Sequence, residues 1–433
     1  MNLKDKINSI KGSKFIIDSS WTIVSHLIVG ISGLLINTLV GIHYNVKGLG
    51  VLNQSLSIYL ILTVFANFGI QSSIHKYTSQ YSENDEEIKR IFSSAILTTF
   101  IASLITTFIF YLVTVNFSFV YKSDEVKELT NILLFAVPLF SLNKTMNNFL
   151  AGKRSMKKYS LIRMSRWIFV ICFILFFIFT SRDLNLIGFA FILTELLLLV
   201  YFVIILKPYY SSFTLLWVKK HCSFGSQSIL IDVVASFNTR IPILLIGYSL
   251  SDSLAGYYSY IETFVFSVML ISGALQKNFN TVYTKLWYAK KNNEINKKIT
   301  KVFKVSSIIS LPLFIGAFAF YFFYTKLFMQ QEYLNYSLET FSLLISIWIT
   351  FILVPFSTLL IMSGYLKLNI LRVAIILFIN IFFISLLLKP FGLYGVAISL
   401  FFSSLIDLFL LQVFYVKKLN INIINKTFLS ILK

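Results

Sequence analysis

Ionisable side chains lie deep inside apolar stretches of this sequence, and residues 223–283 hold four of them. Asp232, Arg240, Glu262 and Lys277 stand there among apolar neighbours. Each such group costs about 2.5–3.5 kcal/mol at the centre of a bilayer helix, so a chain keeps it only where it faces protein or water. The pattern therefore predicts a polar interior within a membrane-spanning protein.

Arg240 is the strongest candidate for a substrate-binding residue. It lies near the centre of its predicted span, too deep for easy snorkelling, and Pro242 loosens the helix just after it. Asp232 shares its helix face, because it lies eight residues earlier. A second interpretation stays open, in which Arg240 forms a structural ion pair with Asp232 or with Glu262 on the next helix.

A polar stripe in the fourth predicted helix gives another candidate site, made of Asn143, Lys144, Asn147 and Asn148. The Asn148 amide is expected beside the Lys144 ammonium, because residues four apart share a helix face. A cavity around Lys144 is favoured over a cation that snorkels from the helix end. Lys277 is a further candidate cation, in the eighth predicted helix.

Other charged groups near or within the predicted spans have plainer interpretations. Arg163 and Arg166 begin the fifth predicted helix and suit headgroup anchors, although Arg166 is deep enough to reach a cleft. Lys76 suits a snorkelling cation near a helix end. His26 is interpreted as a hydrogen-bonded packing residue, with a proton carrier as the alternative. Interhelical hydrogen bonds are expected for two carboxylates, Glu195 and Asp407.

The composition places these residues in a polytopic membrane protein. Hydrophobic residues make up 57% of the 433 residues and charged residues only 13%, against about 25% in soluble domains. The net charge of +20 could suggest nucleic acid, but lysine and arginine fall in short clusters between apolar runs. Such clusters are topology signals, so no nucleic acid partner is expected.

Twelve apolar stretches are long enough to span a bilayer, at about 20 residues each. They cover residues 15–41, 51–78, 91–115, 126–150, 161–180, 186–206, 223–249, 256–282, 302–324, 335–362, 369–388 and 394–416. An even number of spans puts both termini on one side. Alternate connections carry 26 lysines and arginines against 6 in the others, which predicts cytoplasmic termini. The opposite loops are short and leave no room for an extracytoplasmic domain.

The two halves of the sequence resemble each other. A shift of 206 residues superposes Gly41 on Gly247, Gly50 on Gly256 and Tyr77 on Tyr283. Six helices per half give both halves one orientation, as in a parallel repeat about the membrane normal. The sequence therefore predicts an all-α protein with two six-helix lobes, residues 1–210 and 211–433, around a central cleft.

No constellation for catalysis, metal binding or cofactor binding stands out. The four histidines lie on separate predicted elements, and Cys172 and Cys222 have no obvious partner. We therefore expect neither an enzyme nor a metalloprotein. Isolated cations among amides and hydroxyls suit an anionic group such as a phosphate or pyrophosphate, because their attraction strengthens at low effective dielectric.

Three stretches add a family resemblance. Gly41 and Gly50 precede a helix that ends in Asn-Phe-Gly-Ile at residues 67–70. Residues 251–259 read Ser-Asp-Ser-Leu-Ala-Gly-Tyr-Tyr-Ser, and residues 389–397 read Lys-Pro-Phe-Gly-Leu-Tyr-Gly-Val-Ala. Together with twelve spans in two lobes, the chain resembles the Wzx-type O-antigen and polysaccharide lipid flippases. Their superfamily also holds multidrug antiporters and lipid II flippases, which implies a MATE-like fold.

The resemblance implies a bacterial inner-membrane protein that moves an undecaprenyl-diphosphate-linked oligosaccharide to the periplasmic leaflet by alternating access. In such proteins a cationic cavity holds the diphosphate, and the polyprenyl tail stays in lipid. The candidate substrate ligands in this chain are Arg240, Lys277, Lys144 and Arg166. A cation in the first helix, which lipid II flippases use, has no counterpart after Lys14, so that branch fits less well.

Ion coupling and two other functions stay open. Asp232 or Glu262 would respond to a gradient of H⁺ or Na⁺, because a carboxylate near a buried cation can exchange partners. A polysaccharide polymerase and a chain-length regulator are candidate protein partners. The first alternative function is a drug or cation antiporter of the same fold, with a cavity dominated by carboxylates. The second is a membrane polysaccharide polymerase or ligase, although such enzymes carry a large external loop that this sequence lacks.

Overall fold

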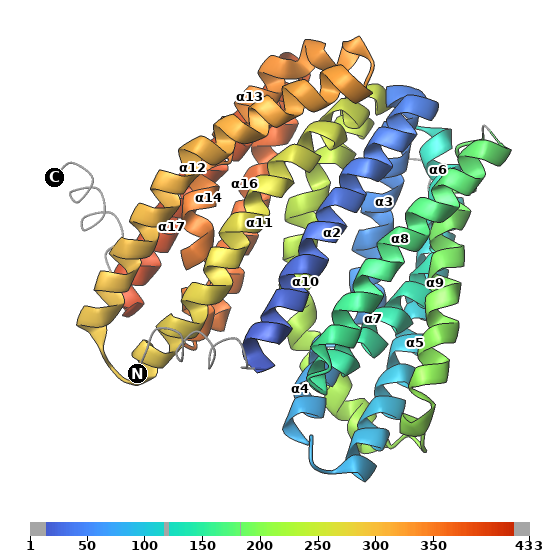
Figure 1. Ribbon diagram of the computed structural model, residues 1–433, viewed down its shortest axis with the longest axis vertical. Coiled ribbons are helices and arrows are strands. Elements are labelled where there is room, and N and C mark those ends of the chain that lie inside the picture. Colours follow the sequence, from blue (N-terminus) through green and yellow to red (C-terminus); the bar gives the residue numbers. More distant parts are fainter. Residues whose placement is uncertain (1–13, 117–120, 182, 420–433) are drawn as a thin grey trace, which may run out of the picture. The chain divides into compact units, whose positions relative to one another are not determined.

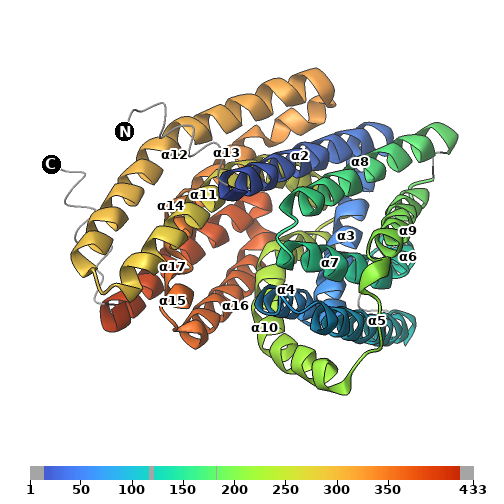
Figure 2. The ribbon, with the colours of Figure 1, turned by 60° about the horizontal axis from the view of Figure 1, so that its bottom comes forward.

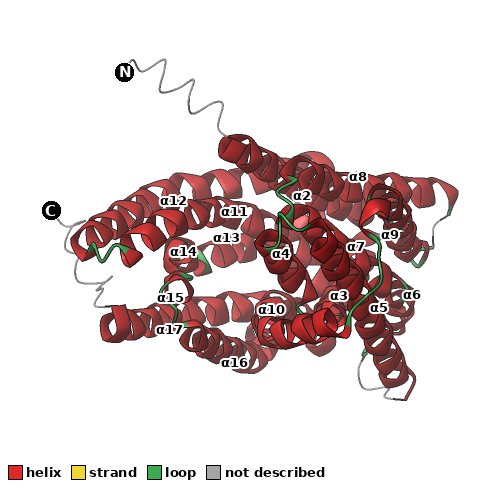
Figure 3. Ribbon diagram, turned by 90° about the horizontal axis from the view of Figure 1, so that it is seen from below, coloured by secondary structure: helices red, strands yellow, loops and turns green. Residues whose placement is uncertain are grey.

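The computed structural model describes residues 14–116, 121–181 and 183–419, whose regular elements are all helices (Figure 1, Figure 3). Among these residues, eleven helices are long and apolar enough to cross a membrane. The count rises to twelve when the bent pair Asp124–Leu134 and Ala136–Gly152 is taken as one span. The prediction of an all-helical protein with twelve spans is therefore confirmed.

The described residues form two compact units, which divide between Ser236 and Phe237. Unit 1 holds, in chain order, α2 (Lys14–His43), α3 (Asn45–Asn67), α4 (Ile70–Gln80), α5 (Asp85–Asn116), α6 (Asp124–Leu134), α7 (Ala136–Gly152), α8 (Met156–Thr180), α9 (Leu186–Ile205) and the 3-10 helix η2 (Lys207–Tyr209). The long helix α10 (Leu215–Ser249) begins in unit 1 and ends in unit 2.

Unit 2 holds the remaining helices of the described chain. They are α11 (Asp252–Tyr288), α12 (Asn292–Phe328), η3 (Gln331–Tyr336), α13 (Ser337–Ser346), α14 (Trp348–Leu353), η4 (Val354–Phe356), α15 (Leu359–Met362), α16 (Leu366–Phe391) and α17 (Leu393–Leu419). Within this unit α16 and α17 pack against each other along their length.

The core of unit 1 lies near the ends of α4, α5 and α7, where Phe92, Phe149 and Trp217 are fully buried. The outer face of α5 is apolar as well, and Leu104 and Phe108 are exposed there. Lipid tails are as apolar as leucine, so this face suits contact with acyl chains. Burial inside unit 1 and exposure to lipid therefore explain why α5 is apolar on both faces after its charged first turns.

The second predicted span, residues 51–78, is not one continuous helix. It breaks at Phe68 and Gly69, which have φ angles of 46° and 68°, so α3 ends at Asn67 and α4 starts at Ile70. A Cβ atom on Gly69 would lie 2.5 Å from the Gly225 carbonyl oxygen. Glycine is needed at both contact positions, because the backbones of α4 and α10 approach each other there.

The tenth predicted span, residues 335–362, is interrupted by the 3-10 turn η4 between α14 and α15. Backbone carbonyls released in a membrane need partners, since the bilayer core offers no water. Gln276 Nε2 donates to the Val354 carbonyl at 2.6 Å, and the Tyr415 hydroxyl donates to the Phe356 carbonyl. Side chains of α11 and α17 thus stabilise the interruption.

Three neighbouring helices of unit 1 carry the polar residues of interest. Helix α8 lies beside α2 in both Figure 1 and Figure 2, and it also packs against α7 and α9. The amide stripe belongs to α7, the arginines Arg163 and Arg166 to α8, and Glu195 to α9. The packing of α8 therefore brings residues that are distant in sequence to one place.

Candidate functional site

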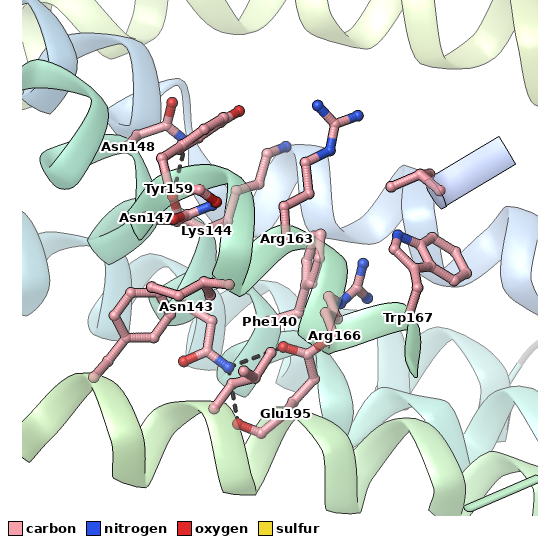
Figure 4. Close-up of a pocket in the computed structure, with 14 residues that line it drawn as sticks. Phe140, Asn143, Lys144, Asn147, Asn148, Tyr159, Arg163, Arg166, Trp167 and Glu195 are labelled. Carbon is pink, nitrogen blue, oxygen red and sulfur yellow. Dashed lines mark hydrogen bonds and ion pairs between the residues drawn. The ribbon is translucent and has the colours of Figure 1, made fainter. Parts of the chain in front are cut away.

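A cavity of about 360 Å³ lies inside unit 1 among α2, α7, α8 and α9 (Figure 4). Its polar lining comprises Asn143, Lys144, Asn147, Asn148, Tyr159, Arg163, Arg166 and Glu195. All four residues of the predicted amide stripe on α7 are included. Phe140 and Trp167 add aromatic surface, so the cavity combines cations, amides, one hydroxyl and ring faces.

Lys144 brings a positive charge to this cavity without a carboxylate beside it. No salt bridge within the described part of the chain includes its ammonium. The Nζ atom lies 5.8 Å from the centre of the Phe140 ring, and the Asn148 amide donates to the Lys144 main-chain carbonyl at 2.8 Å. That amide was expected beside the ammonium, but it instead stabilises the helix backbone.

Arg166 lines the same cavity but is tied to Glu195, which is fully buried on α9. Asn143 Nδ2 donates to the Glu195 carboxylate at 2.9 Å and to its main-chain carbonyl at 2.8 Å. The guanidinium also lies over the Phe140 ring, 4.2 Å from its centre, and near Trp167. A buried ion pair with these partners is held in place, so Arg166 is a fixed part of the wall.

Arg163 faces the cavity one turn before Arg166. Its Nη1 atom lies 3.1 Å from His26 Nε2, and Nη2 lies 3.2 Å from His26 Nδ1. A neutral imidazole does not neutralise the guanidinium charge. Both arginines line the cavity among α2, α7, α8 and α9, and Arg166 thus reaches a cleft, as its depth in the span suggested. A role as headgroup anchors stays a prediction.

The lining carries a net positive charge. Lys144, Arg163 and Arg166 supply three positive charges and Glu195 one negative charge, which leaves two. Figure 4 shows Lys144 and Arg163 pointing the same way, while Arg166 lies between Phe140 and Trp167, toward Glu195. The two cations without a salt bridge in the described residues therefore point the same way, whereas Arg166 is neutralised by Glu195.

Asp232 lies in the part of α10 that belongs to unit 1. Its carboxylate accepts a hydrogen bond of 2.9 Å from Gln71 Nε2 on α4, and it lies within electrostatic range of Lys144. The break before α4 positions Gln71 for this contact, since α4 starts a new helix at Ile70. Asp232 thus attracts the Lys144 ammonium electrostatically within unit 1.

In unit 2, Arg240 is half-buried on α10 and lies within electrostatic range of Glu262 and Tyr258 on α11. No salt bridge below 4 Å joins Arg240 to Glu262 in the described chain. The side chain of Lys277 lies outside the described residues. The convergence of Arg240 and Lys277 with the cations of unit 1 on one chamber stays a prediction.

Unit 2 contains a second buried pair of an arginine and a carboxylate, of which the sequence singled out only Asp407. Arg372 Nη1 on α16 lies 2.6 Å from Asp407 Oδ1 on α17, and Arg372 Nη2 donates to the Ser357 carbonyl and to Asn369 Oδ1, at 3.2 Å each. The shift of 206 residues superposes Arg166 on Arg372, so the internal repeat could have revealed it. The carboxylates escaped that comparison because Glu195 and Asp407 are 212 residues apart.

The comparison with known families decides what kind of protein this is. Residues 16–276, more than half of the chain, match the family model of the polysaccharide biosynthesis proteins. The chain is a member of this family. The family match covers unit 1 from residue 16 onward, including every residue that lines the cavity.

This polysaccharide biosynthesis protein also resembles named flippases. It is 32% identical over 84 residues to the lipid III flippases of Escherichia coli (strain K12) and Shigella flexneri. That match covers 19% of this chain and 20% of each relative.

Solved structures show the fold of this polysaccharide biosynthesis protein. The lipid II flippase MurJ, in an inward closed conformation, has a TM-score of 0.76 at 15% identity, over 96% of this chain and 91% of that one. An inward-facing multidrug resistance MATE family transporter of the MOP superfamily has a TM-score of 0.74 at 12% identity, over 90% and 94% of the two chains. The predicted MATE-like fold is therefore confirmed.

Proposed function

We propose that this chain is a flippase for an undecaprenyl-diphosphate-linked oligosaccharide, the repeat unit of O-antigen or of another surface polysaccharide. The proposal places it in the bacterial inner membrane, where it carries the lipid from the cytoplasmic to the periplasmic leaflet by alternating access. The observation that carries the proposal is the pair of cations, Lys144 and Arg163, that face the cavity of unit 1 without an acidic partner.

A diphosphate suits such a pair of cations. Two opposite unit charges 4 Å apart attract each other by about 4 kcal/mol at an effective dielectric constant of 20. Lys144 and Arg163 would each contact one phosphate, while the Arg166–Glu195 pair keeps the wall rigid. Asn147, Asn148 and Tyr159 would donate and accept hydrogen bonds with sugar hydroxyls.

Two further features support the choice of substrate and membrane side. The lipid III flippase of Escherichia coli acts, by its name, on a lipid, and it shares 32% identity with an 84-residue part of this chain. The excess of lysine and arginine in alternate connections, 26 against 6, favours cytoplasmic termini. The polyprenyl tail would remain in the bilayer throughout.

Coupling to an ion gradient is assigned in this proposal to Asp232 or Glu262. Asp232 lies within electrostatic range of Lys144, and Glu262 within range of Arg240. Binding of an anionic lipid to the cation would release the carboxylate to take up H⁺ or Na⁺. Asp232→Asn and Glu262→Gln test this in proteoliposomes, and translocation that keeps the gradient dependence of the wild type in both variants would remove the coupling hypothesis.

The site itself is tested by surface polysaccharide production in cells whose own copy has been deleted. We expect Lys144→Ala and Arg163→Ala to reduce the polysaccharide at least tenfold, and Lys144→Arg to retain part of it, because the phosphate contact needs a positive charge. Lys153→Ala is the matched control, since Lys153 follows α7 but pairs with the exposed Asp85 at 3.7 Å. Protein levels in the membrane are compared by immunoblotting.

Two outcomes would contradict this function. Normal polysaccharide in both alanine variants at matched protein level would show that the cavity does not hold the diphosphate. Loss of cationic drug efflux, with polysaccharide unchanged, would instead favour the antiporter of the same fold.

A further inference from the structure

A second cavity of about 480 Å³ lies where α4 meets the start of α10, within unit 1 and apart from the first cavity. We call it the basic cavity. Its lining contains three lysines and no carboxylate: Lys76, Tyr77, Leu216, Lys219, Lys220, Ser223, Phe224 and Gln227. A concave surface with this lining attracts a group that carries more than one negative charge.

Aromatic rings hold two of the lysines in position. Lys76 Nζ lies 4.4 Å from the centre of the Phe224 ring, and Lys220 Nζ lies 4.0 Å from the centre of the Trp217 ring. Salt bridges of the described chain include none of Lys76, Lys219 and Lys220. A cation–π contact leaves ammonium N–H groups available to a ligand.

Hydrogen bonds beside the basic cavity tie its helices together. Trp217 Nε1 donates to Glu87 Oε1 on α5 at 2.6 Å. One turn further along α10, the buried His221 lies 2.7 Å from Ser73 Oγ on α4 and 3.2 Å from the Ile91 carbonyl on α5. The lysines of α4 and α10 are therefore carried by helices that are locked together, and the site exists before any ligand binds.

Apolar side chains adjoin the lysines on α10. Leu215 and Leu216 are 69% and 59% exposed, and Phe213, just before the helix, is 54% exposed. Lysine beside exposed leucine is typical of the membrane interface, where the charge meets headgroups and the apolar surface meets acyl chains. Inorganic phosphate has no apolar part that could contact these exposed side chains. The surroundings of the lysines therefore favour an amphiphilic ligand.

We propose that the basic cavity binds the phosphate-bearing headgroup of an anionic membrane phospholipid, whose acyl chains lie along Leu215 and Leu216. The bound lipid bridges Lys76 on α4 with Lys219 and Lys220 on α10 and so stabilises the contact between these helices. This site does not depend on the identity of any transported substrate.

The test measures lipid binding by the purified full-length protein in an uncharged detergent, with native mass spectrometry as the readout. The probes are phosphatidylglycerol, zwitterionic phosphatidylcholine and inorganic phosphate. We expect phosphatidylglycerol to bind at least tenfold more tightly than phosphatidylcholine. The triple variant Lys76→Gln, Lys219→Gln and Lys220→Gln should bind it about 100-fold more weakly, since each lysine near a membrane surface contributes about fivefold.

A matched control removes the same charge elsewhere. Lys297→Gln, Lys298→Gln and Lys301→Gln replace three exposed lysines of α12, and binding should stay within twofold of the wild type. A triple lysine-to-arginine variant at the basic cavity guards against misfolding and should keep most of the affinity. Equal weakening in the two glutamine triples would overturn the site, because net charge alone would then explain binding. Competition by millimolar inorganic phosphate as effective as that by the lipid would overturn the lipid assignment.

Discussion

Cations of similar charge have different environments inside unit 1. Arg166 is buried with Glu195, Asn143 and two aromatic rings, whereas Lys144 forms no salt bridge in the described structure and has only the more distant Asp232 within electrostatic range. A buried charge that loses its partner becomes strongly unfavourable, while a buried charge without one already bears its desolvation cost. Stability and substrate binding should therefore separate at the two residues.

Neutralising each cation in turn tests that separation. We expect Arg166→Gln to lower the free energy of unfolding by about 3–5 kcal/mol, because Glu195 is left as an unpaired buried charge. Lys144→Gln should leave the free energy of unfolding unchanged or raise it slightly. Denaturant unfolding in detergent micelles, followed by tryptophan fluorescence, measures both. Equal losses in the two variants would mean that Lys144 is also a structural cation.

Substitutions that change the charge or the length of the Arg240 side chain distinguish a substrate-binding role from a structural role. As a substrate ligand, its replacement by alanine should abolish surface polysaccharide, while Arg240→Lys should retain part of it because the charge remains. As a structural partner of Glu262, it should instead tolerate the double replacement Arg240→Gln and Glu262→Gln. Polysaccharide production at matched protein level in these variants distinguishes the two roles.

At the scale of the helices, two helix breaks position functional side chains. The α3–α4 break turns Gln71 toward Asp232, and it depends on two glycines at a backbone contact between α4 and α10. Interruption of the tenth span likewise depends on hydrogen bonds from α11, α16 and α17 to released carbonyls. Hydropathy does not predict either break, because residues 51–78 and residues 335–362 each form one continuous apolar stretch.

Replacement of a contact glycine by alanine should lower stability more than the same replacement at an ordinary helix glycine. Gly69→Ala meets both a left-handed backbone and the Gly225 carbonyl, so a loss of about 2 kcal/mol or more is expected in the free energy of unfolding. Gly33→Ala is the control, because nothing lies within 4 Å of its added methyl group and alanine favours helix. Thermal unfolding in detergent measures both. A loss at Gly33 as large as that at Gly69 would contradict the assigned contact.

The released carbonyl of Val354 gives a second test at this scale. Gln276→Ala removes a donor at 2.6 Å from that oxygen and at 2.7 Å from Ser357 Oγ. The Ser357 main-chain N–H and hydroxyl still donate to the carbonyl, at 3.1 and 3.0 Å, so the expected loss of unfolding free energy is that of ordinary hydrogen bonds, about 0.5–1.5 kcal/mol each. Gln80→Ala, at an exposed helix end, should change the unfolding free energy by less than 0.5 kcal/mol. If the Gln276 variant unfolds like the wild type, the Ser357 donors alone satisfy the carbonyl and Gln276 does not stabilise the interruption.

At the scale of the whole molecule, both units contain a buried arginine that joins two consecutive long helices. Arg166 and Glu195 join α8 to α9, and Arg372 and Asp407 join α16 to α17. Arg166 borders a cavity, whereas Arg372 is enclosed by Asp407, Asn369 and the Ser357 carbonyl. The duplicated pair thus supports the idea of an internal repeat in which one unit lines a cavity and the other stabilises a broken helix.

Replacing both members of each ion pair by apolar residues should show that the two pairs have different roles. Replacing both members of a buried ion pair by apolar residues often costs little stability, since no uncompensated charge remains. We therefore expect Arg372→Met with Asp407→Leu to keep polysaccharide production and to lose only about 1–3 kcal/mol of stability, because the Ser357 carbonyl loses its Arg372 donor. Arg166→Met with Glu195→Leu should keep most of the stability but reduce polysaccharide at least tenfold, because the cavity wall changes shape. Equal polysaccharide levels in the two doubles would contradict a special role for the pair in unit 1.

Much of the architecture was predictable because a bilayer constrains helix length and composition strongly. Residue spacing predicts the twelve apolar stretches and the amide stripe on α7. The cost of burying charge in lipid predicts that Lys144 faces a cavity, which it does. The tertiary structure decided which cations have acidic partners: Glu195 on α9 neutralises Arg166, while Arg163 turns to His26 and remains positive. Pairing of that kind joins residues distant in the chain, and only the packing of α8 against α2, α7 and α9 brings them within hydrogen-bonding distance.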